Sequence, residues 1–255
     1  MARRPRLDMA GYHYVVNRGV ARSNIFTSPS DKEKFLQILC KACKLYDVVV
    51  HDYCLMDNHY HLLLETKQEN LSLIMRQINS YYAIYFNKKE SRVGHLWQGR
   101  FRSWYVLNEE YLYFLLRYIE YNPIKANLSN KPGEYPYTLA STLFGRAETI
   151  PCAKESILIQ DFSPQTLIEF LETELSEEEF NALQQEQKRK ISIENEDIKV
   201  TRSKTLNEHF NDTVSKQERN RAIIEAFKDG YTQSSIANYL NLSTSLICGV
   251  IKSVD

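Results

Sequence analysis

The 255-residue chain has no long hydrophobic run. No apolar stretch approaches the ~20 residues that a membrane-spanning helix needs. The first sixteen residues also lack the apolar centre of a secretory signal. The glycine-rich phosphate loop of P-loop ATPases is absent as well. We therefore expect a cytoplasmic protein with no membrane partner, whose chemistry does not draw on ATP.

Cysteine is scarce, with five residues at scattered positions. An odd, scattered set is typical of a reducing compartment. Cys40 and Cys43 form a C-x-x-C pattern, but they lie within a predicted amphipathic helix, and no second cysteine pair completes a zinc site. We interpret both as half-buried helix residues.

Net charge is absent too, since 32 basic residues balance 32 acidic ones. Zero net charge at first argues against a nucleic-acid partner, but the charges are unevenly placed. Residues 1–150 carry twenty Lys and Arg against fourteen Asp and Glu, whereas residues 151–200 carry five against twelve. A basic first part hidden by an acidic middle is compatible with binding to DNA.

Composition predicts three regions. Residues 1–150 form the main domain, and residues 151–205 form an acidic helical spacer that ends in a polar linker. Residues 206–255 form a small all-α domain.

The main domain shows the order β-α-β-β-α-β followed by a helix. Alternating and 3.6-residue periodicities, caps and turns define these elements. The predicted strands cover residues 12–17, 48–56 and 59–65, and residues 94–106 form a loop that leads into a fourth strand. The predicted helices cover 34–46, 71–87 and 109–121, the last limited by Pro123. This order predicts an α+β fold, a ferredoxin-like antiparallel sheet with helices on one face. The open face could receive a substrate.

Two pairs of polar residues are spaced to meet at one point. His59 and His61 share a face of a strand, and Tyr118 and Asn122 share a face of a helix. Two imidazoles and an amide oxygen could hold a divalent cation beside a phenol. Paired histidines or a single tyrosine often only fill a core, but the combination favours a metal-assisted tyrosine nucleophile. We interpret Glu120 as a solvated charge.

The sequence resembles a known family at these residues. The segment Asp57-Asn58-His59-Tyr60-His61-Leu62-Leu63 resembles the HUH motif of single-strand DNA transposases with one catalytic tyrosine. The segment Tyr118-Ile119-Glu120-Tyr121-Asn122-Pro123 resembles the Tyr-Ile-x-x-Asn-Pro signature of their REP-associated branch. The resemblance covers about residues 8 to 146. Tyr60 departs mildly from the usual aliphatic residue.

The resemblance implies an HUH endonuclease fold and a metal-dependent cut in single-stranded, hairpin-forming DNA. The catalytic tyrosine would be Tyr118, which would form a 5′-phosphotyrosine and leave a free 3′-hydroxyl. The metal, Mg²⁺ or Mn²⁺, would be held by His59, His61 and Asn122. A phenol with a pKa near 10 needs such help at neutral pH.

Basic and aromatic side chains provide a candidate surface for single-stranded DNA, which needs cations for phosphates and flat rings for bases. The predicted contacts are Arg18, Arg22, Arg100 and Arg102, the last two interleaved with Trp97, Phe101 and Trp104. The alternative is that the three aromatic residues belong to the core. For Trp104 the sequence favours neither interpretation over the other.

The C-terminal region resembles the helix-turn-helix tails of transcription factors and recombinases. Its last predicted helices cover residues 233–240 and 244–252, with Leu246 among the expected apolar contacts. The second helix would present Ser243, Thr244, Ser245 and Lys252 to adjoining duplex DNA. The alternative is a small protein-contact domain, since the tail is only weakly basic.

Two other functions stay open at this point. One is a DNA-binding regulator whose ancestral chemistry is silent. The other is a rolling-circle-type replication initiator, although such proteins usually place a lysine or a second tyrosine where this chain has Asn122. The protein would act as a monomer or a homodimer.

Overall fold

The structure is a computed structural model that describes residues 8–146, 148–187, 190–194, 197–201, 204–211, 213, 215–229 and 231–252. The chain divides into two compact units, Met1–Glu179 and Phe180–Asp255. Among the described residues, no helix combines the length and the apolar character needed to cross a membrane.

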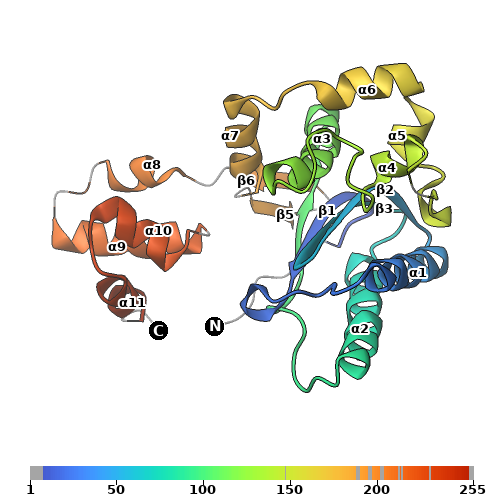
Figure 1. Ribbon diagram of the computed structural model, residues 1–255. Coiled ribbons are helices and arrows are strands. Elements are labelled where there is room, and N and C mark those ends of the chain that lie inside the picture. The colour runs from blue at the N-terminus through green and yellow to red at the C-terminus, as the bar shows by residue number, and fades with distance from the viewer. Residues whose placement is uncertain are drawn as a thin grey trace. The chain divides into compact units, whose positions relative to one another are not determined.

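The first unit is built on a four-stranded antiparallel sheet (Figure 1). Its strands are β1 (Gly11–Arg18), β2 (Val48–Met56), β3 (His59–Thr66) and β4 (Arg102–Tyr105), in the spatial order β2-β3-β1-β4. Together with two helices in the order β1-α1-β2-β3-α2-β4, this is the ferredoxin-like arrangement. The predicted fold class is confirmed.

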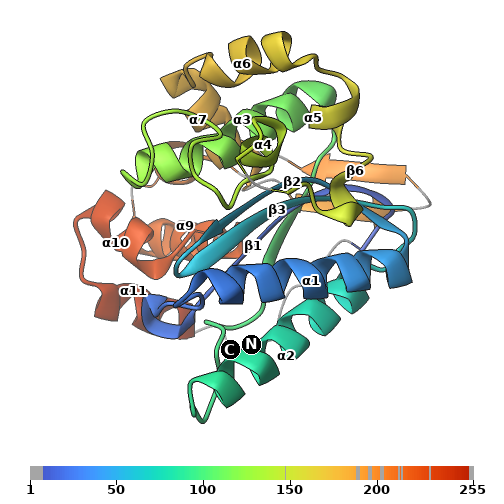
Figure 2. The ribbon, with the colours of Figure 1, turned by 45° about the vertical axis from the view of Figure 1, so that its right-hand side comes forward.

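Helices lie on both faces of this sheet. Figure 2 shows α1 (Pro29–Tyr46) and α2 (Leu71–Lys89) below the sheet and α3 (Glu109–Lys125) above it. Tyr60 of β3 points toward these two helices. The centroid of its ring lies 4.8 Å from that of Phe35 in α1, and its hydroxyl donates to Asn79 in α2. Side chains alternate along a strand, so His59 and His61 point to the face that carries α3. The face that the sequence left open therefore receives the helix with Tyr118.

The cap of α1 sets its start earlier than the sequence predicted. Ser28 is the N-cap, Pro29 follows at the first helical position, and Asp31 completes a capping box by accepting from the Ser28 amide. The buried Asp31 carboxylate also pairs with Lys89 of α2. This contact ties the two helices together on one face of the sheet.

Helix α3 continues four residues beyond its predicted end, through Pro123 to Lys125. A proline inside a helix has no amide hydrogen for the carbonyl four residues earlier, here that of Ile119. The Asn122 side chain compensates, since its amide nitrogen donates to the carbonyls of Tyr118 at 2.7 Å and of Ile119 at 3.4 Å. The side chain next to the proline thus supplies a missing donor.

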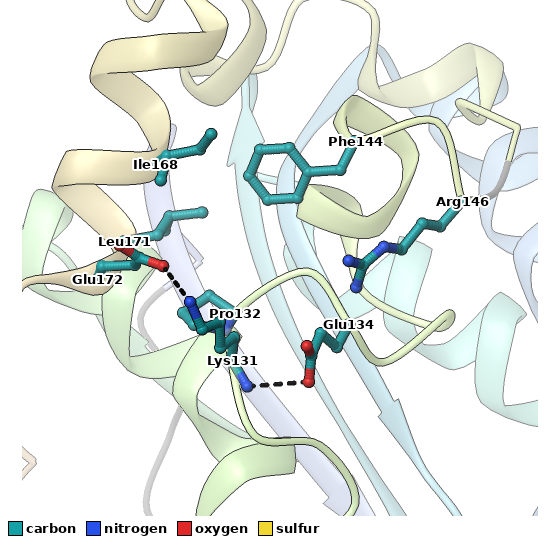
Figure 3. Close-up of a pocket in the computed structure, with 8 residues that line it drawn as sticks. All are labelled: Lys131, Pro132, Glu134, Phe144, Arg146, Ile168, Leu171 and Glu172. Atoms are coloured by element: carbon teal, nitrogen blue, oxygen red, sulfur yellow. Dashed lines mark hydrogen bonds and ion pairs between the residues drawn. The ribbon is translucent and has the colours of Figure 1, made fainter.

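Several short elements complete the first unit. It contains the short elements η1 (Val20–Arg22), α4 (Leu139–Leu143), η2 (Pro151–Ala153), α5 (Ile157–Gln160) and α6 (Pro164–Glu172), and α7 (Glu177–Glu186) spans the boundary between the units. A shallow pocket lies between α6 and the chain on either side of α4 (Figure 3). It is lined by Lys131, Pro132, Glu134, Phe144, Arg146, Ile168, Leu171 and Glu172, none of which is a predicted site residue.

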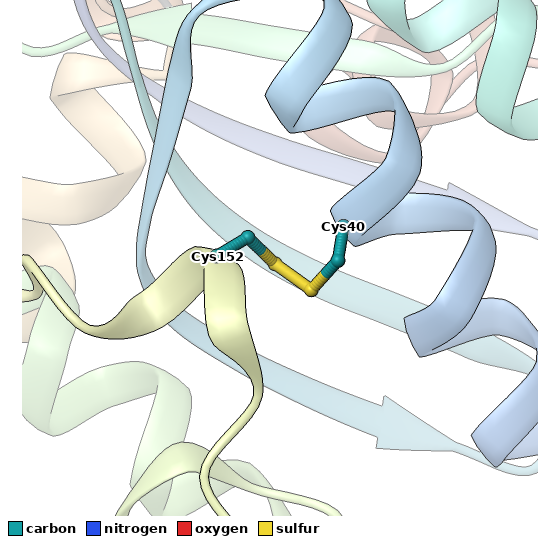
Figure 4. Close-up of a disulfide and its surroundings, with 2 residues drawn as sticks. All are labelled: Cys40 and Cys152. Atoms are coloured by element: carbon teal, nitrogen blue, oxygen red, sulfur yellow. A yellow bond between two sulfur atoms is a disulfide. The ribbon is translucent and has the colours of Figure 1, made fainter.

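A disulfide links Cys40 of α1 to Cys152 of η2 (Figure 4). The bond pins the segment after α4 to a helix 112 residues earlier in the chain. Cys43 is buried and free, as expected of a helix residue. Because two of the five cysteines pair, the scattered cysteine count no longer supports the expectation of a reducing compartment.

Beyond α7, the described part of the second unit contains a hairpin and a set of helices. These are β5 (Lys190–Glu194), β6 (Asp197–Thr201), α8 (Leu206–Phe210), α9 (Lys216–Lys228), α10 (Gln233–Leu240) and α11 (Thr244–Lys252). The helices enclose their own apolar core, which includes Ile223, Ile236 and Ile247. Helices α10 and α11 have the predicted bounds. The hairpin occupies a segment predicted as linker, where β-branched residues alternate with polar ones, a pattern typical of strands.

Candidate functional site

The two histidines lie at the start of β3, directly after the turn formed by Asp57 and Asn58. Their rings are 4.9 Å apart between centroids and inclined by 79°. His61 stands opposite Val16 of β1 and Cys54 of β2, so it occupies the middle of the sheet and is buried. His59 and His61 therefore lie on the same face of β3, as predicted.

Tyr118 projects from α3 toward His61. The two ring centroids are 6.2 Å apart, and the rings meet edge to face at 86°. Asn122 lies one turn further along the same helix and bonds through its nitrogen to the Tyr118 carbonyl. The fold thus brings together His61 and Tyr118, although more than fifty residues separate them in the sequence.

Each histidine uses its Nδ1 atom within the protein. Nδ1 of His59 lies 2.6 Å from Oδ1 of Asn58, and Nδ1 of His61 lies 2.6 Å from the hydroxyl of Tyr14. Nε2 of His61 is buried and has no hydrogen-bond partner among the described residues. The sequence analysis assigned Tyr14 no role at the site, because the β1–β3 register is what brings it beside His61.

Electrostatics keep both imidazoles neutral near pH 7. Burial lowers the pKa of His59, and the nearby Arg18 guanidinium lowers that pKa further. Burial also holds the pKa of His61 well below its usual 6.5, with the neighbouring His59 acting in the same direction. Neutral imidazoles offer the lone pairs that a metal ion needs.

Tyr118 is a protonated phenol at neutral pH. Burial raises its pKa above the ordinary value of 10, while a hydrogen bond from Tyr14 lowers it. Nucleophilic attack by this phenol at neutral pH therefore requires further stabilisation of its oxyanion.

The residues present fit a divalent metal ion. Within the described part of the chain, no three His, Cys, Asp or Glu side chains are grouped to hold a metal. A three-ligand centre here must then include another donor, and the amide oxygen of Asn122 is of a suitable kind. The buried, unpartnered Nε2 of His61 is an atom that such an ion would satisfy.

Glu120 is not a solvated charge. It is 1% exposed and its carboxylate accepts from the backbone amide of Ala140, near the start of α4, at 2.8 Å. Burial raises the pKa of Glu120 and that of the adjacent, equally buried Asp52. Glu120 is buried because α4 lies against the side of α3 that carries this residue.

A buried lysine supports the turn before the histidines. Lys32 of α1 donates to Asp57 at 2.8 Å and to the hydroxyl of Tyr135 at 2.7 Å. The Tyr135 hydroxyl in turn donates to the backbone carbonyl of Leu55 in β2. Asp57 thus helps to fix the turn, and no direct contact between its side chain and a histidine ring is seen among the described residues.

The four predicted DNA-contact arginines are all exposed. They are Arg18 at the end of β1, Arg22 in η1, Arg100 before β4 and Arg102 in β4. Arg102 stands opposite Val16, which stands opposite His61, so these three residues share one row and one face of the sheet. The row runs from the candidate site to the sheet edge.

The three aromatic residues near these arginines divide between core and site. Phe101 is buried, and Trp97 is half-buried and donates to the carbonyl of Asn79. Trp104 is half-buried and stacks on Tyr14, with centroids 5.4 Å apart. Phe101 and Trp97 therefore serve packing, whereas Trp104 belongs to the aromatic surroundings of the site.

In the second unit, the predicted contact residues lie on the surface of α11 and its cap. Ser243, Thr244, Ser245 and Lys252 are exposed. Leu246, expected in the core, is 41% exposed, while its neighbour Ile247 is buried. The core face of α11 is thus rotated by one residue from the predicted one.

The fold and the site together define an α+β domain with a histidine pair facing a tyrosine on a helix. Residues 8–122 match the family model described as "Transposase IS200 like". Over these residues, which include His59, His61 and Tyr118, the chain is similar to the IS200-like transposase family.

Three solved structures resemble the chain at low identity. A REP-associated tyrosine transposase bound to a REP hairpin is 19% identical over 64% of this chain and 96% of its own, with a TM-score of 0.47. A putative transposase from Deinococcus radiodurans R1 is 15% identical over 47% and 96%, with a TM-score of 0.34. A tRNA(His) guanylyltransferase from Saccharomyces cerevisiae is 14% identical over 69% and 77%, with a TM-score of 0.35. No curated protein matches the chain.

Proposed function

We propose that this chain is a metal-dependent, single-tyrosine transposase that cuts and rejoins single-stranded, hairpin-forming DNA. The observation that carries the proposal is the convergence of His59, His61 and Tyr118, with a buried histidine nitrogen in the cluster that has no hydrogen-bond partner in the described part of the chain. The REP-associated branch of the family is the proposed relation, on the resemblance of residues 118–123.

The cation, Mg²⁺ or Mn²⁺ held by His59, His61 and Asn122, would withdraw charge from the scissile phosphate. Oη of Tyr118 attacks phosphorus, and the bond from phosphorus to the 3′-oxygen breaks. The phenolic proton is lost to water, and the departing 3′-oxygen gains one, which leaves a free 3′-hydroxyl and a 5′-phosphotyrosine. The reverse reaction with another 3′-hydroxyl joins the strands, because the covalent link conserves the phosphodiester energy.

Binding of the DNA would fall to the exposed arginines. Arg18 adjoins His59 in the sheet register, and Arg102 lies in the same row as His61. Cations at these positions can hold phosphates on either side of the cut, and Arg22 and Arg100 extend the basic surface. A hairpin is the proposed substrate, and a REP hairpin is the DNA bound to the REP-associated tyrosine transposase.

The second unit would bind duplex DNA beside the hairpin through Ser243, Thr244, Ser245 and Lys252, which its separate core presents at the surface. This unit is also the feature that favours the second candidate function, a DNA-binding regulator. In that case the unit would bind DNA while Tyr118 stays inactive.

The decisive experiment uses labelled single-stranded hairpin DNA and Mn²⁺. Wild-type protein should become attached to the 5′ end of the downstream fragment and migrate slowly in a denaturing gel. Tyr118→Phe, which removes one oxygen and keeps the ring, should bind the DNA and form no adduct. Tyr121→Phe, three residues further on the same helix, should keep the adduct.

Loss of the adduct in Tyr121→Phe with retention in Tyr118→Phe would mean that the nucleophile is misassigned. If wild-type protein with metal and a cleavable hairpin forms no adduct but still binds DNA, the regulator function replaces the enzyme.

A further inference from the structure

We propose that Tyr14 is a positioning residue that holds His61 with its Nε2 atom directed at the metal. This inference rests on the proposed function, since it assigns His61 to a metal site. It concerns a residue to which the sequence assigned no role and which lies on a different strand from the histidines.

Tyr14 is fixed by its neighbours in the sheet. It is 1% exposed and lies in β1, the strand between β3 and β4. Its ring stacks on Trp104 with centroids 5.4 Å apart, and it is parallel within 6° to the His61 ring, with centroids 5.9 Å apart. A buried side chain packed in this way has little freedom to rotate. The direction of the Tyr14 hydroxyl is therefore set by the sheet.

That hydroxyl bonds to Nδ1 of His61 at 2.6 Å. A neutral imidazole has one donor nitrogen and one acceptor nitrogen, and the partner of one nitrogen decides the role of the other. When Nδ1–H donates to the Tyr14 oxygen, Nε2 keeps its lone pair. Histidines that bind metals commonly donate their second nitrogen to such an oxygen acceptor.

Nε2 of His61 is buried and lacks a partner among the described residues. His13 and His209 also bond through one ring nitrogen and leave the other without a partner there. Of these three histidines, His61 is the one whose ring lies against a second histidine and Tyr118. Tyr60, the next residue in β3, provides the contrast, because it is equally buried and its hydroxyl donates to Asn79 within the packed core on the other face. The Tyr14 bond leaves Nε2 of His61 for the candidate site, as the bond to Asn58 leaves Nε2 of His59.

Tyr14 also contacts the nucleophile. Its ring centroid is 6.2 Å from that of Tyr118, with the rings edge to face at 88°. One side chain thus touches both the metal ligand His61 and the attacking Tyr118. A change at Tyr14 should alter metal binding without altering the exposed surface that holds DNA.

The test compares Tyr14→Phe with Tyr60→Phe, each of which loses one buried hydroxyl and keeps its ring. Mn²⁺ binding to the full-length protein without DNA is measured by electron paramagnetic resonance. Tyr14→Phe should weaken Mn²⁺ binding by about 10–100-fold, the usual effect of losing a residue that orients a ligand. Tyr60→Phe should bind Mn²⁺ as wild type does, and both should keep wild-type affinity for the hairpin.

Equal Mn²⁺ affinity in wild type and Tyr14→Phe would overturn the proposal, as would wild-type protein that binds no Mn²⁺. Weakened Mn²⁺ binding in Tyr14→Phe, together with a wild-type protein that forms no DNA adduct, would support the role of Tyr14 and refute the proposed function alone.

A second measurement uses wild-type protein, in case Tyr14→Phe does not fold. Nitrogen-15 NMR of the Mg²⁺-loaded protein identifies the protonated nitrogen of His61, assigned by comparison with His61→Gln. A proton on Nδ1 supports the proposal, whereas a proton on Nε2 overturns it.

Discussion

Asn122 carries two chemical groups with different tasks in this site. Its amide nitrogen donates to the carbonyls of Tyr118 and Ile119, where Pro123 leaves a donor missing. Its oxygen is the proposed metal ligand. Asn122 would thus stabilise the helix and also take part in the reaction. Substitution by alanine removes both groups, so its effect on activity alone does not separate the two roles.

Two substitutions separate the tasks. Asn122→Ala should lower the free energy of unfolding by about 1 kcal/mol, through the lost hydrogen bonds, and raise the Mn²⁺ concentration needed for adduct formation. Asn122→Asp keeps an oxygen ligand but has no amide hydrogens, so it should restore the Mn²⁺ response and not the stability. Chemical denaturation and a Mn²⁺ titration of adduct formation measure the two effects. If alanine leaves the Mn²⁺ dependence unchanged, Asn122 does not bind the metal.

Residues with a fixed spacing along one element were predictable, and those brought in by tertiary contacts were not. His59 and His61 share a strand face whatever the rest of the fold does. The position of Tyr14 beside His61 depends on the pairing of β1 with β3, which no local pattern states. Glu120 shows the same limit, because its burial depends on where α4 lies.

At the scale of elements, α3 is held in place by buried polar contacts as well as apolar packing. The Glu120 carboxylate accepts from the Ala140 amide of α4, and the Asp52 carboxyl lies beside it on β2. The helix that bears Tyr118 is thus joined both to the sheet and to the helix that follows.

The buried carboxyl group of Glu120 makes the stability of the protein depend on pH. Because burial raises the pKa of Glu120 above its ordinary 4.5, the folded protein keeps a proton that the unfolded chain releases. The free energy of unfolding of the wild-type protein should therefore fall as pH rises from 5 to 8. In Glu120→Gln, whose side chain cannot ionise, this decrease should be smaller than in wild type by about 1–3 kcal/mol. Urea denaturation at both pH values measures the change, with Glu110→Gln, exposed on the same helix, as control. Equal pH slopes for wild type and Glu120→Gln would contradict the assignment.

Element order was predictable from periodicity and caps, while element ends and long-range links were not. The strand order follows from β-α-β-β-α-β. The end of α3 was missed because Asn122 offsets the effect of Pro123, a compensation visible only in the folded helix. The bond between Cys40 and Cys152 was missed because 112 residues separate its partners.

At the scale of the whole molecule, the helices between Leu206 and Lys252 have an apolar core of their own. Deletion of residues 205–255 should leave adduct formation on an optimal single-stranded hairpin and lower affinity for a hairpin with adjoining duplex. Gel-shift titrations with the two DNAs measure the difference. Failure of the isolated tail to bind any DNA at low salt would refute its role as a helix-turn-helix.

The anchoring of α3 has a consequence for strand exchange. Under the proposed function, a 5′ end joined to Tyr118 is held on a helix whose neighbouring Glu120 is buried and bonded to α4. The captured end is then stationary, and a new junction forms only when a free 3′-hydroxyl travels to it. The relative abundance and proximity of competing 3′ ends, rather than a swing of the nucleophile, would decide whether the original strand is resealed or a recombinant one is made.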